Sequence, residues 1–124
     1  MSSPMVTLRD LAQQDVDDAT TALGKSQQAF LHAEQQLTML LNYQDEYRQR
    51  LNQGMSGGMD ASSWRNYQQF IRTLDQAIDQ HRLQLNQCNI RLATATRCWQ
   101  EKQQRLNALY APRAPRASAK NAAQ

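Results

Sequence analysis

Apolar residues spaced alternately four and three positions apart dominate two long stretches of the sequence. In the first stretch these positions are Ala12, Val16, Ala19, Leu23, Ser26, Phe30, Ala33, Leu37, Leu40, Gln44, Tyr47 and Leu51. In the second they are Trp64, Tyr67, Ile71, Leu74, Ile78, His81, Leu85, Cys88, Leu92, Ala95, Trp99, Lys102, Leu106 and Leu109. Such spacing places the apolar side chains on one narrow stripe of a helix and is typical of a coiled coil.

Helix-start and helix-stop signals bound the two stretches. Ser3 followed by Pro4 is a favourable start. The linking segment 52–63, NQGMSGGMDASS, contains three glycines and then candidate N-caps at Asp60, Ser62 and Ser63. We expect a helix over 4–52, a loop over 53–62 and a helix over 63–110. Two helices of similar length joined by a short loop predict an all-α fold, a long antiparallel two-helix coiled-coil hairpin over 1–110.

The C-terminal segment 111–124, APRAPRASAKNAAQ, has a different composition. It contains two prolines, three basic residues and no large apolar residue. Because such a segment cannot bury enough apolar surface to offset its ordering entropy, we predict a disordered basic tail.

The pairing register of the helices is predicted from residue size. Partners whose numbers sum to about 118 place a large residue opposite a small one in most layers, as Ala33 opposite Leu85 and Ala19 opposite Trp99. A register shifted by one heptad, with a sum of 111, also packs acceptably. An acidic start of the first helix then lies beside a basic end of the second, which favours the antiparallel direction.

A third apolar row accompanies the coiled-coil stripe. With Leu37 as heptad position a and Leu40 as d, the g positions include Tyr43, Phe70 and Ala77, whereas the e positions are mostly polar. A two-stranded coiled coil does not require this row, and exposed aromatic residues of this kind indicate a binding surface. The alternative is a homodimer, a four-helix bundle that buries the same row.

The charge distribution does not favour nucleic-acid binding. Residues 1–110 contain equal numbers of basic and acidic side chains, so the net charge of +3 comes from Arg113, Arg116 and Lys120 in the tail. Three charges in a flexible segment predict at best weak, salt-sensitive phosphate contacts.

No residue pattern indicates catalysis, a metal site or a cofactor site. Cys88 and Cys98 are about 15 Å apart along one helix, which is too far for a disulfide. His32 and His81 are far apart in the sequence, and His81 falls on the coiled-coil stripe. We therefore expect no enzyme activity, no metal and no cofactor. No run approaches the roughly 20 apolar residues of a membrane span, so we expect no direct membrane insertion.

Three segments resemble a known family. LAQQDVDDA at 11–19, LNYQDEYRQRL at 41–51 and WRNYQQFIRTLDQAIDQHRLQL at 64–85 are similar to the FliJ family, the coiled-coil component of the bacterial flagellar type III export apparatus. The resemblance implies a non-enzymatic cytoplasmic adaptor, peripherally associated with the inner-membrane export apparatus. It implies as partners the hexameric export ATPase, the cytoplasmic domain of the export-gate protein, and export chaperones.

The resemblance also implies which residues bind a partner. The gate-docking positions of the family correspond here to eight residues, which we call the docking set: Gln36, Leu40, Tyr43, Tyr47, Phe70, Leu74, Ala77 and His81. They coincide with the apolar row found from the heptad pattern. Two alternatives to the adaptor function remain, a purely structural coiled-coil homodimer and a chaperone that holds export substrates.

Overall fold

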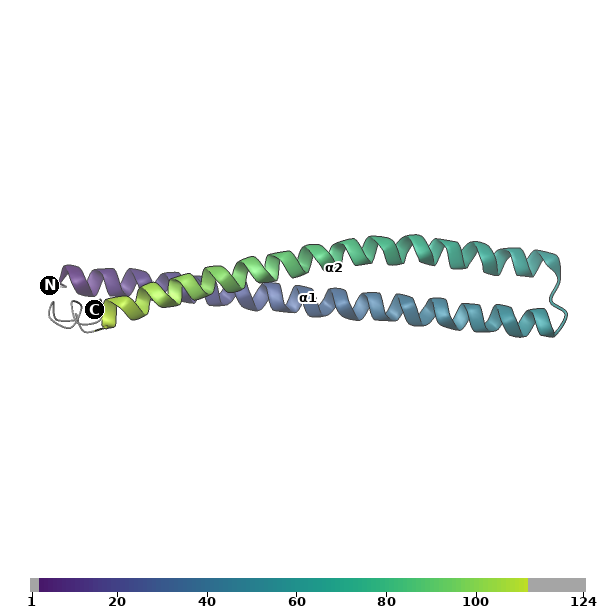
Figure 1. Cartoon of the computed structure of the whole chain (residues 1–124), viewed down its shortest axis with the longest axis horizontal. Helices are drawn as coiled ribbons and strands as arrows, with labels where there is room; N and C mark the ends of the chain where they lie inside the picture. Colours follow the sequence, from purple (N-terminus) through teal and green to yellow (C-terminus); the bar gives the residue numbers. More distant parts are fainter. Residues whose placement is uncertain (1–2, 112–124) are drawn as a thin grey trace, which may run out of the picture. The chain divides into compact units, whose positions relative to one another are not determined.

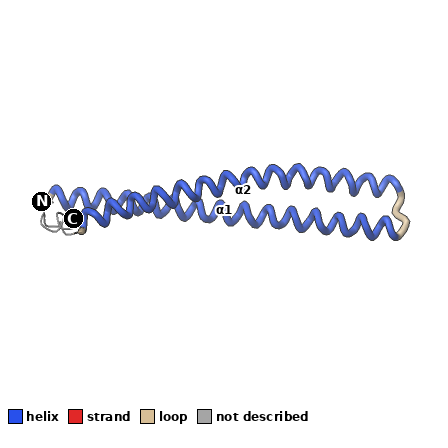
Figure 2. Tube along the Cα trace, in the orientation of Figure 1, coloured by secondary structure: helices blue, strands red, loops and turns tan. Residues whose placement is uncertain are grey.

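The computed structural model describes residues 3–111 and shows two helices, α1 (Pro4–Ser56) and α2 (Ala61–Tyr110). The helices are antiparallel and joined by residues 57–60 (Figures 1 and 2). The predicted all-helical antiparallel hairpin is therefore confirmed. Apart from Ala111, the predicted tail at 111–124 lies outside the described residues.

The chain divides into two compact units, each of which pairs a segment of α1 with a segment of α2. Unit 1 contains Met1–Leu23 and Ala95–Gln124, and unit 2 contains Gly24–Thr94. Each unit has its own interhelical contacts, and the docking set lies entirely in unit 2.

The helix ends differ from the expected ones at the loop. The helix break predicted at Gly54 does not occur, and α1 continues to Ser56. Gly54 remains helical, and a Cβ there would collide with the Met59 side chain, which folds back over the last turn. Met59 N donates to the Gly54 carbonyl at 2.7 Å, and Gly58 has φ +82°, which is the glycine-dependent end of a Schellman motif.

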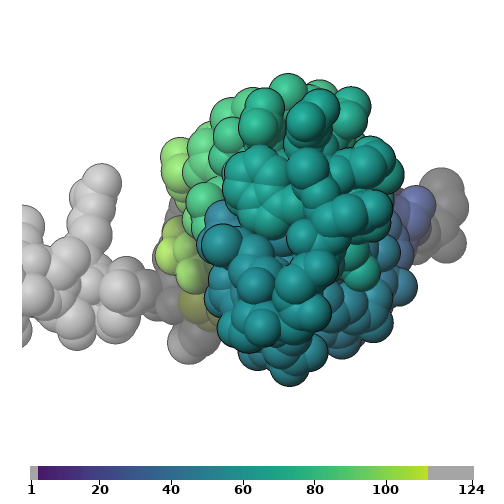
Figure 3. All heavy atoms as spheres, turned by 90° about the vertical axis from the view of Figure 1, so that its right-hand side faces the viewer, coloured from purple at the N-terminus to yellow at the C-terminus, as the bar shows by residue number. Residues whose placement is uncertain are grey.

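Side-chain caps start both helices. Ser3 Oγ accepts a hydrogen bond from Val6 N at 3.1 Å, as expected for the N-cap of α1. Asp60 Oδ1 accepts one from Ser63 N at 2.9 Å, so Asp60 is the N-cap of α2 and the helix begins two residues earlier than predicted. Hydrogen bonds from Ser63, from its side chain and its backbone, lower the pKa of the Asp60 carboxyl. Figure 3 shows this loop end as a rounded, closely packed face.

The core of each unit is the predicted 4-3 stripe. Every residue buried within 3–111 belongs to it: Ala12, Val16, Ala19 and Leu106 in unit 1, and Ala33, Gln44, Leu51, Ile71, Leu74 and Ile78 in unit 2. Even the most buried of these, Ile78, retains 3% of its exposure. A thin core of this kind is what two helices without a third layer can form.

Contacts within each unit select the register with the sum of 118. In unit 1, Arg9 Nε and Nη2 both donate to the Leu109 carbonyl at 3.1 Å, and Trp99 Nε1 donates to Thr20 Oγ1 at 3.1 Å. In unit 2, the Tyr47 ring lies 4.4 Å from the Phe70 ring. A shift by one heptad would instead place Tyr47 opposite Trp64.

One buried polar residue interrupts the stripe in unit 2. Gln44 Nε2 donates to the Asp75 carboxylate and, at 3.5 Å, to the Ile71 carbonyl. A polar residue at an a position specifies register at a cost in stability. The two hydrogen bonds satisfy the Gln44 amide and so reduce the cost of burying it. We infer that Gln44 helps to select the register of the hairpin.

Replacing Gln44 with Leu is expected to stabilise the hairpin. A buried polar pair replaced by an apolar side chain of similar volume commonly gains about 1 kcal/mol or more, which is about 4 °C in thermal midpoint. Asp75 keeps its exposed ion pair with Arg48. Thermal denaturation followed by circular dichroism measures the change, with Gln28→Leu on the exposed side of α1 as the control. A midpoint that falls for Gln44→Leu would show that the polar layer is a net stabiliser.

A candidate protein-docking surface

The docking set separates into exposed, intermediate and buried members. Tyr43 and Phe70 are 51% and 41% exposed, whereas Leu74 is buried in the core. The others are half-buried: Gln36, Leu40, Tyr47, Ala77 and His81. The aromatic rings of Tyr43 and Phe70 are therefore accessible to a partner protein. Leu74 is buried and contributes only to the core that supports these rings.

Tyr47 connects the two helices at this surface. Its ring packs against Phe70 at 4.4 Å and against Tyr67 at 5.8 Å between centroids, with tilted planes in both pairs. The Arg50 guanidinium lies over the Tyr47 ring, 5.4 Å from its centroid. Residues from α1 and α2 thus form one aromatic cluster whose exposed edge is Phe70.

Two shallow hollows adjoin these rings. One is lined by Tyr47, Asn66, Tyr67 and Phe70. The other is lined by Met39, Asn42, Tyr43 and Glu46. The sequence pattern assigned Tyr67 to the hairpin core and gave no role to Met39 or Asn66, because single residues beside a stripe produce no periodic signal.

The His81 imidazole has an unsatisfied atom. Its Nδ1 is shielded from solvent and has no hydrogen-bond partner among the described protein atoms. A buried polar atom without a partner costs stability, so the hairpin itself gains little from a histidine at this position.

The opposite flank of unit 2 carries an exposed ion pair and one exposed large apolar residue, Leu41. Arg48 and Asp75 form an ion pair across the helices at 3.8 Å, with both side chains more than half exposed. An exposed pair of this kind contributes little to stability. The exposed aromatic rings of Tyr43 and Phe70 lie on the other flank.

The described residues contain no group of acidic, histidine or cysteine side chains arranged to hold a metal ion. Cys88 and Cys98 are free thiols. In the part of the chain covered by α1 and α2, no segment is long and apolar enough to cross a membrane.

Comparison with known proteins identifies the family. The family model described as "Flagellar FliJ protein" matches residues 1–113. The chain belongs to the FliJ family. The flagellar FliJ protein of Salmonella typhi is 51% identical over 102 residues, covering 82% of this chain and 69% of the relative. The flagellar FliJ protein of Escherichia coli (strain K12) is 50% identical over 104 residues, covering 84% and 71%.

Membership of the FliJ family makes this chain a component of flagellar export. The resemblance inferred from three sequence segments is thereby confirmed, and it extends over nearly the whole chain. Assignment to the FliJ family does not by itself assign a role to any residue of the docking set.

Proposed function

We propose that the chain is an adaptor that couples the export ATPase ring to the cytoplasmic domain of the export-gate protein and engages export chaperones. The docking set in unit 2 binds the gate. The observation that supports this most is the exposure of Tyr43 and Phe70, one from each helix, beside a Tyr47 ring that joins the helices.

The energetics favour a binding role for these rings. Aromatic side chains supply much of the binding energy at protein interfaces because they bury a large area with few rotatable bonds. Tyr43 contributes little to the hairpin, since half of its surface is exposed to solvent.

Replacing Tyr43 with Ala tests the proposal directly. We expect the affinity for the purified gate domain, measured by calorimetric titration, to fall about tenfold or more, as for an interface hot spot. The thermal midpoint of the hairpin is expected to stay within about 2 °C, because an exposed side chain contributes little to folding.

The matched control is Leu83→Ala on α2. Leu83 is 65% exposed and lies outside the docking set, so its loss is expected to leave gate affinity unchanged. A large drop in thermal midpoint for Tyr43→Ala would assign the ring to the core instead. Equal affinities of the wild type and Tyr43→Ala would remove this residue from the interface.

Binding titrations and sedimentation distinguish the two alternatives from the adaptor function. A substrate-holding chaperone binds an unfolded export substrate as tightly as the gate domain when both are titrated side by side. A four-helix homodimer has twice the monomer mass by sedimentation at micromolar concentration and covers the docking set. We expect a monomer that prefers the folded gate domain.

A further inference from the structure

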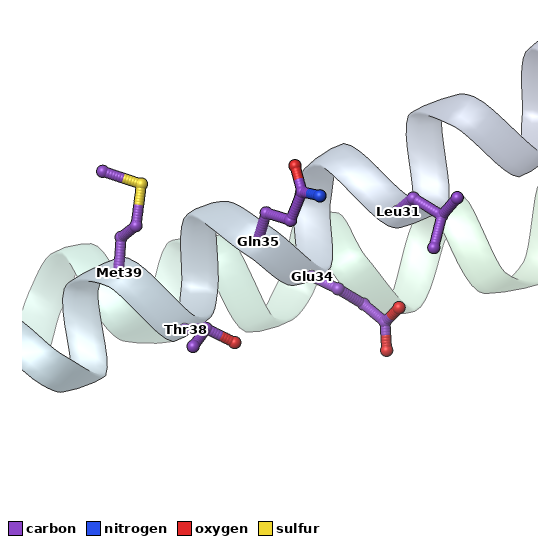
Figure 4. A pocket seen from close by; sticks show the side chains of 5 residues that line it. All are labelled: Leu31, Glu34, Gln35, Thr38 and Met39. Carbon is purple, nitrogen blue, oxygen red and sulfur yellow. The ribbon is translucent and has the colours of Figure 1, made fainter.

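The outer surface of α1 in unit 2 carries apolar side chains outside the docking set. Leu31 and Met39 are 49% and 59% exposed. Figure 4 shows them around a shallow hollow with Glu34, Gln35 and Thr38, while α2 passes behind α1. The hairpin does not use this surface, because all five side chains lie on the exposed face.

The hollow continues along the helix. Met39 also lines the neighbouring hollow, together with Asn42, Tyr43 and Glu46. The two hollows therefore form one strip along α1 from Leu31 to Glu46, which we call the α1 outer strip. Leu31, Met39 and Tyr43 are exposed along this strip at intervals among polar side chains, and exposed large apolar residues that recur along one helix face suit a contact site for another protein.

The charge along the strip has one sign. Residues 26–47 contain three carboxylates, Glu34, Asp45 and Glu46, and no lysine or arginine. One carboxylate lines each hollow, Glu34 the first and Glu46 the second. Among the described residues neither forms an ion pair, since the salt bridges there join Arg48 to Asp75 and Lys102 to Asp15.

We propose that the α1 outer strip docks a basic amphipathic helix of a partner protein. The apolar face of that helix covers Leu31 and Met39, and its lysine or arginine side chains reach Glu34 and Glu46. These carboxylates are separated by about 18 Å along α1. A partner helix lying along α1 therefore needs basic residues about three turns apart.

This second interface goes beyond gate docking. Leu31, Glu34 and Met39 are not members of the docking set, and a partner held there leaves Phe70 and Tyr67 accessible. The strip touches the docking set at Tyr43, so tests of the strip must leave that residue unchanged.

Binding of two designed peptides tests the proposal. Both are stapled, fluorescein-labelled helices of about 18 residues, long enough to remain helical when constrained. They share one leucine face and differ in carrying lysine or glutamate at the flanks. By fluorescence anisotropy at physiological salt, we expect the full chain to bind the lysine peptide at least about tenfold tighter than the glutamate peptide.

Substitutions on the strip are expected to change this preference in two distinct ways. Leu31→Ser with Met39→Ser weakens the lysine peptide about fivefold or more, because the apolar contact is lost. Glu34→Lys with Glu46→Lys reverses the preference in favour of the glutamate peptide. The control Leu83→Ser, on the exposed face of α2, leaves both affinities unchanged. The single variants Leu31→Ser and Glu34→Lys, which lie outside the hollow at Tyr43, keep the wild-type gate affinity.

Three outcomes would overturn the proposal. The first is an equal affinity for the two peptides, and the second is an equal loss of affinity in Leu83→Ser. The third is self-association of the chain in sedimentation velocity that Leu31→Ser with Met39→Ser abolishes. In that case the occupant is a second copy, whose α2 offers exposed Leu83 and Ile90 on a stretch without acidic residues, 80–100.

Discussion

Ile78→Asp is expected to remove most of the stability of the hairpin at 25 °C. Ile78 is the most buried side chain in the described part of the chain, and it lies where α2 contacts α1 in unit 2. A carboxylate there would be desolvated, and no lysine or arginine lies in the stripe beside it. Lost apolar burial and an unpaired buried charge together cost about 3–5 kcal/mol.

Such a loss is a large fraction of the free energy of unfolding of any domain, and especially of one whose core is formed by only two helices. Native stabilities are about 5–15 kcal/mol, and a two-helix core without a third layer is expected near the lower limit. The measurement is mean ellipticity at 222 nm during urea titration. We expect the transition midpoint to fall by more than half, with loss of helicity before any denaturant is added.

Leu83→Asp is the matched control, with the same new side chain five positions along the same helix. Because Leu83 is largely exposed, the new carboxylate stays in water, and the free energy of unfolding is expected to change by less than about 0.5 kcal/mol. If both variants lose the same stability, burial along the stripe does not determine the stability of the hairpin.

The buried residues and the register of the two helices follow from the sequence pattern. The 4-3 spacing predicts the buried residues because a residue's position on the helix surface depends on sequence separation alone. Size alternation predicts the register, since Ala19 leaves room for Trp99 and Ala33 for Leu85. The structure agrees on both points.

The helix ends and the finer parts of the surface follow from contacts that no periodic pattern contains. α1 continues through Gly54 to Ser56, and Met59 then packs over Gly54 and donates to its carbonyl, a contact set by residues 57–60. Leu74 belongs to the docking set that the family resemblance implies, yet it is buried in the core, as the 4-3 spacing predicts. The α1 outer strip combines residues spaced four positions apart, such as Leu31, Gln35 and Met39. That they line two adjoining hollows follows from the folded structure and not from their spacing.

Replacing Leu8 and Leu11 with Ser is expected to abolish stimulation of the cognate export ATPase. We extend the proposed adaptor function by assigning the contact with the ATPase ring to the end of unit 1 that contains the start of α1 and the end of α2. Large apolar residues are exposed at that end of unit 1: Met5, Val6, Leu8 and Leu11 on α1 and Tyr110 on α2. The core of unit 1 consists instead of Ala12, Val16, Leu106 and Leu109.

Unit 1 is therefore expected to fold normally without the two leucines. Arg9 still binds the Leu109 carbonyl and still lies over the Tyr110 ring at 4.4 Å, so the ends of the helices remain joined. What is lost is apolar area for a partner, about 1.5 to 3 kcal/mol for each leucine that becomes buried on binding. Phosphate release by the ATPase is then expected to fall to the rate measured without the adaptor.

The strongest form of this experiment compares the two surfaces of the adaptor. Leu8→Ser with Leu11→Ser is expected to lose ATPase stimulation and keep gate affinity, and Tyr43→Ala is expected to do the reverse. Both variants should keep the thermal midpoint of the wild type. If the unit 1 variant still stimulates hydrolysis fully, the ring does not contact this end of α1. If each variant loses both activities, ATPase and gate compete for one surface, and coupling through two separate sites is wrong.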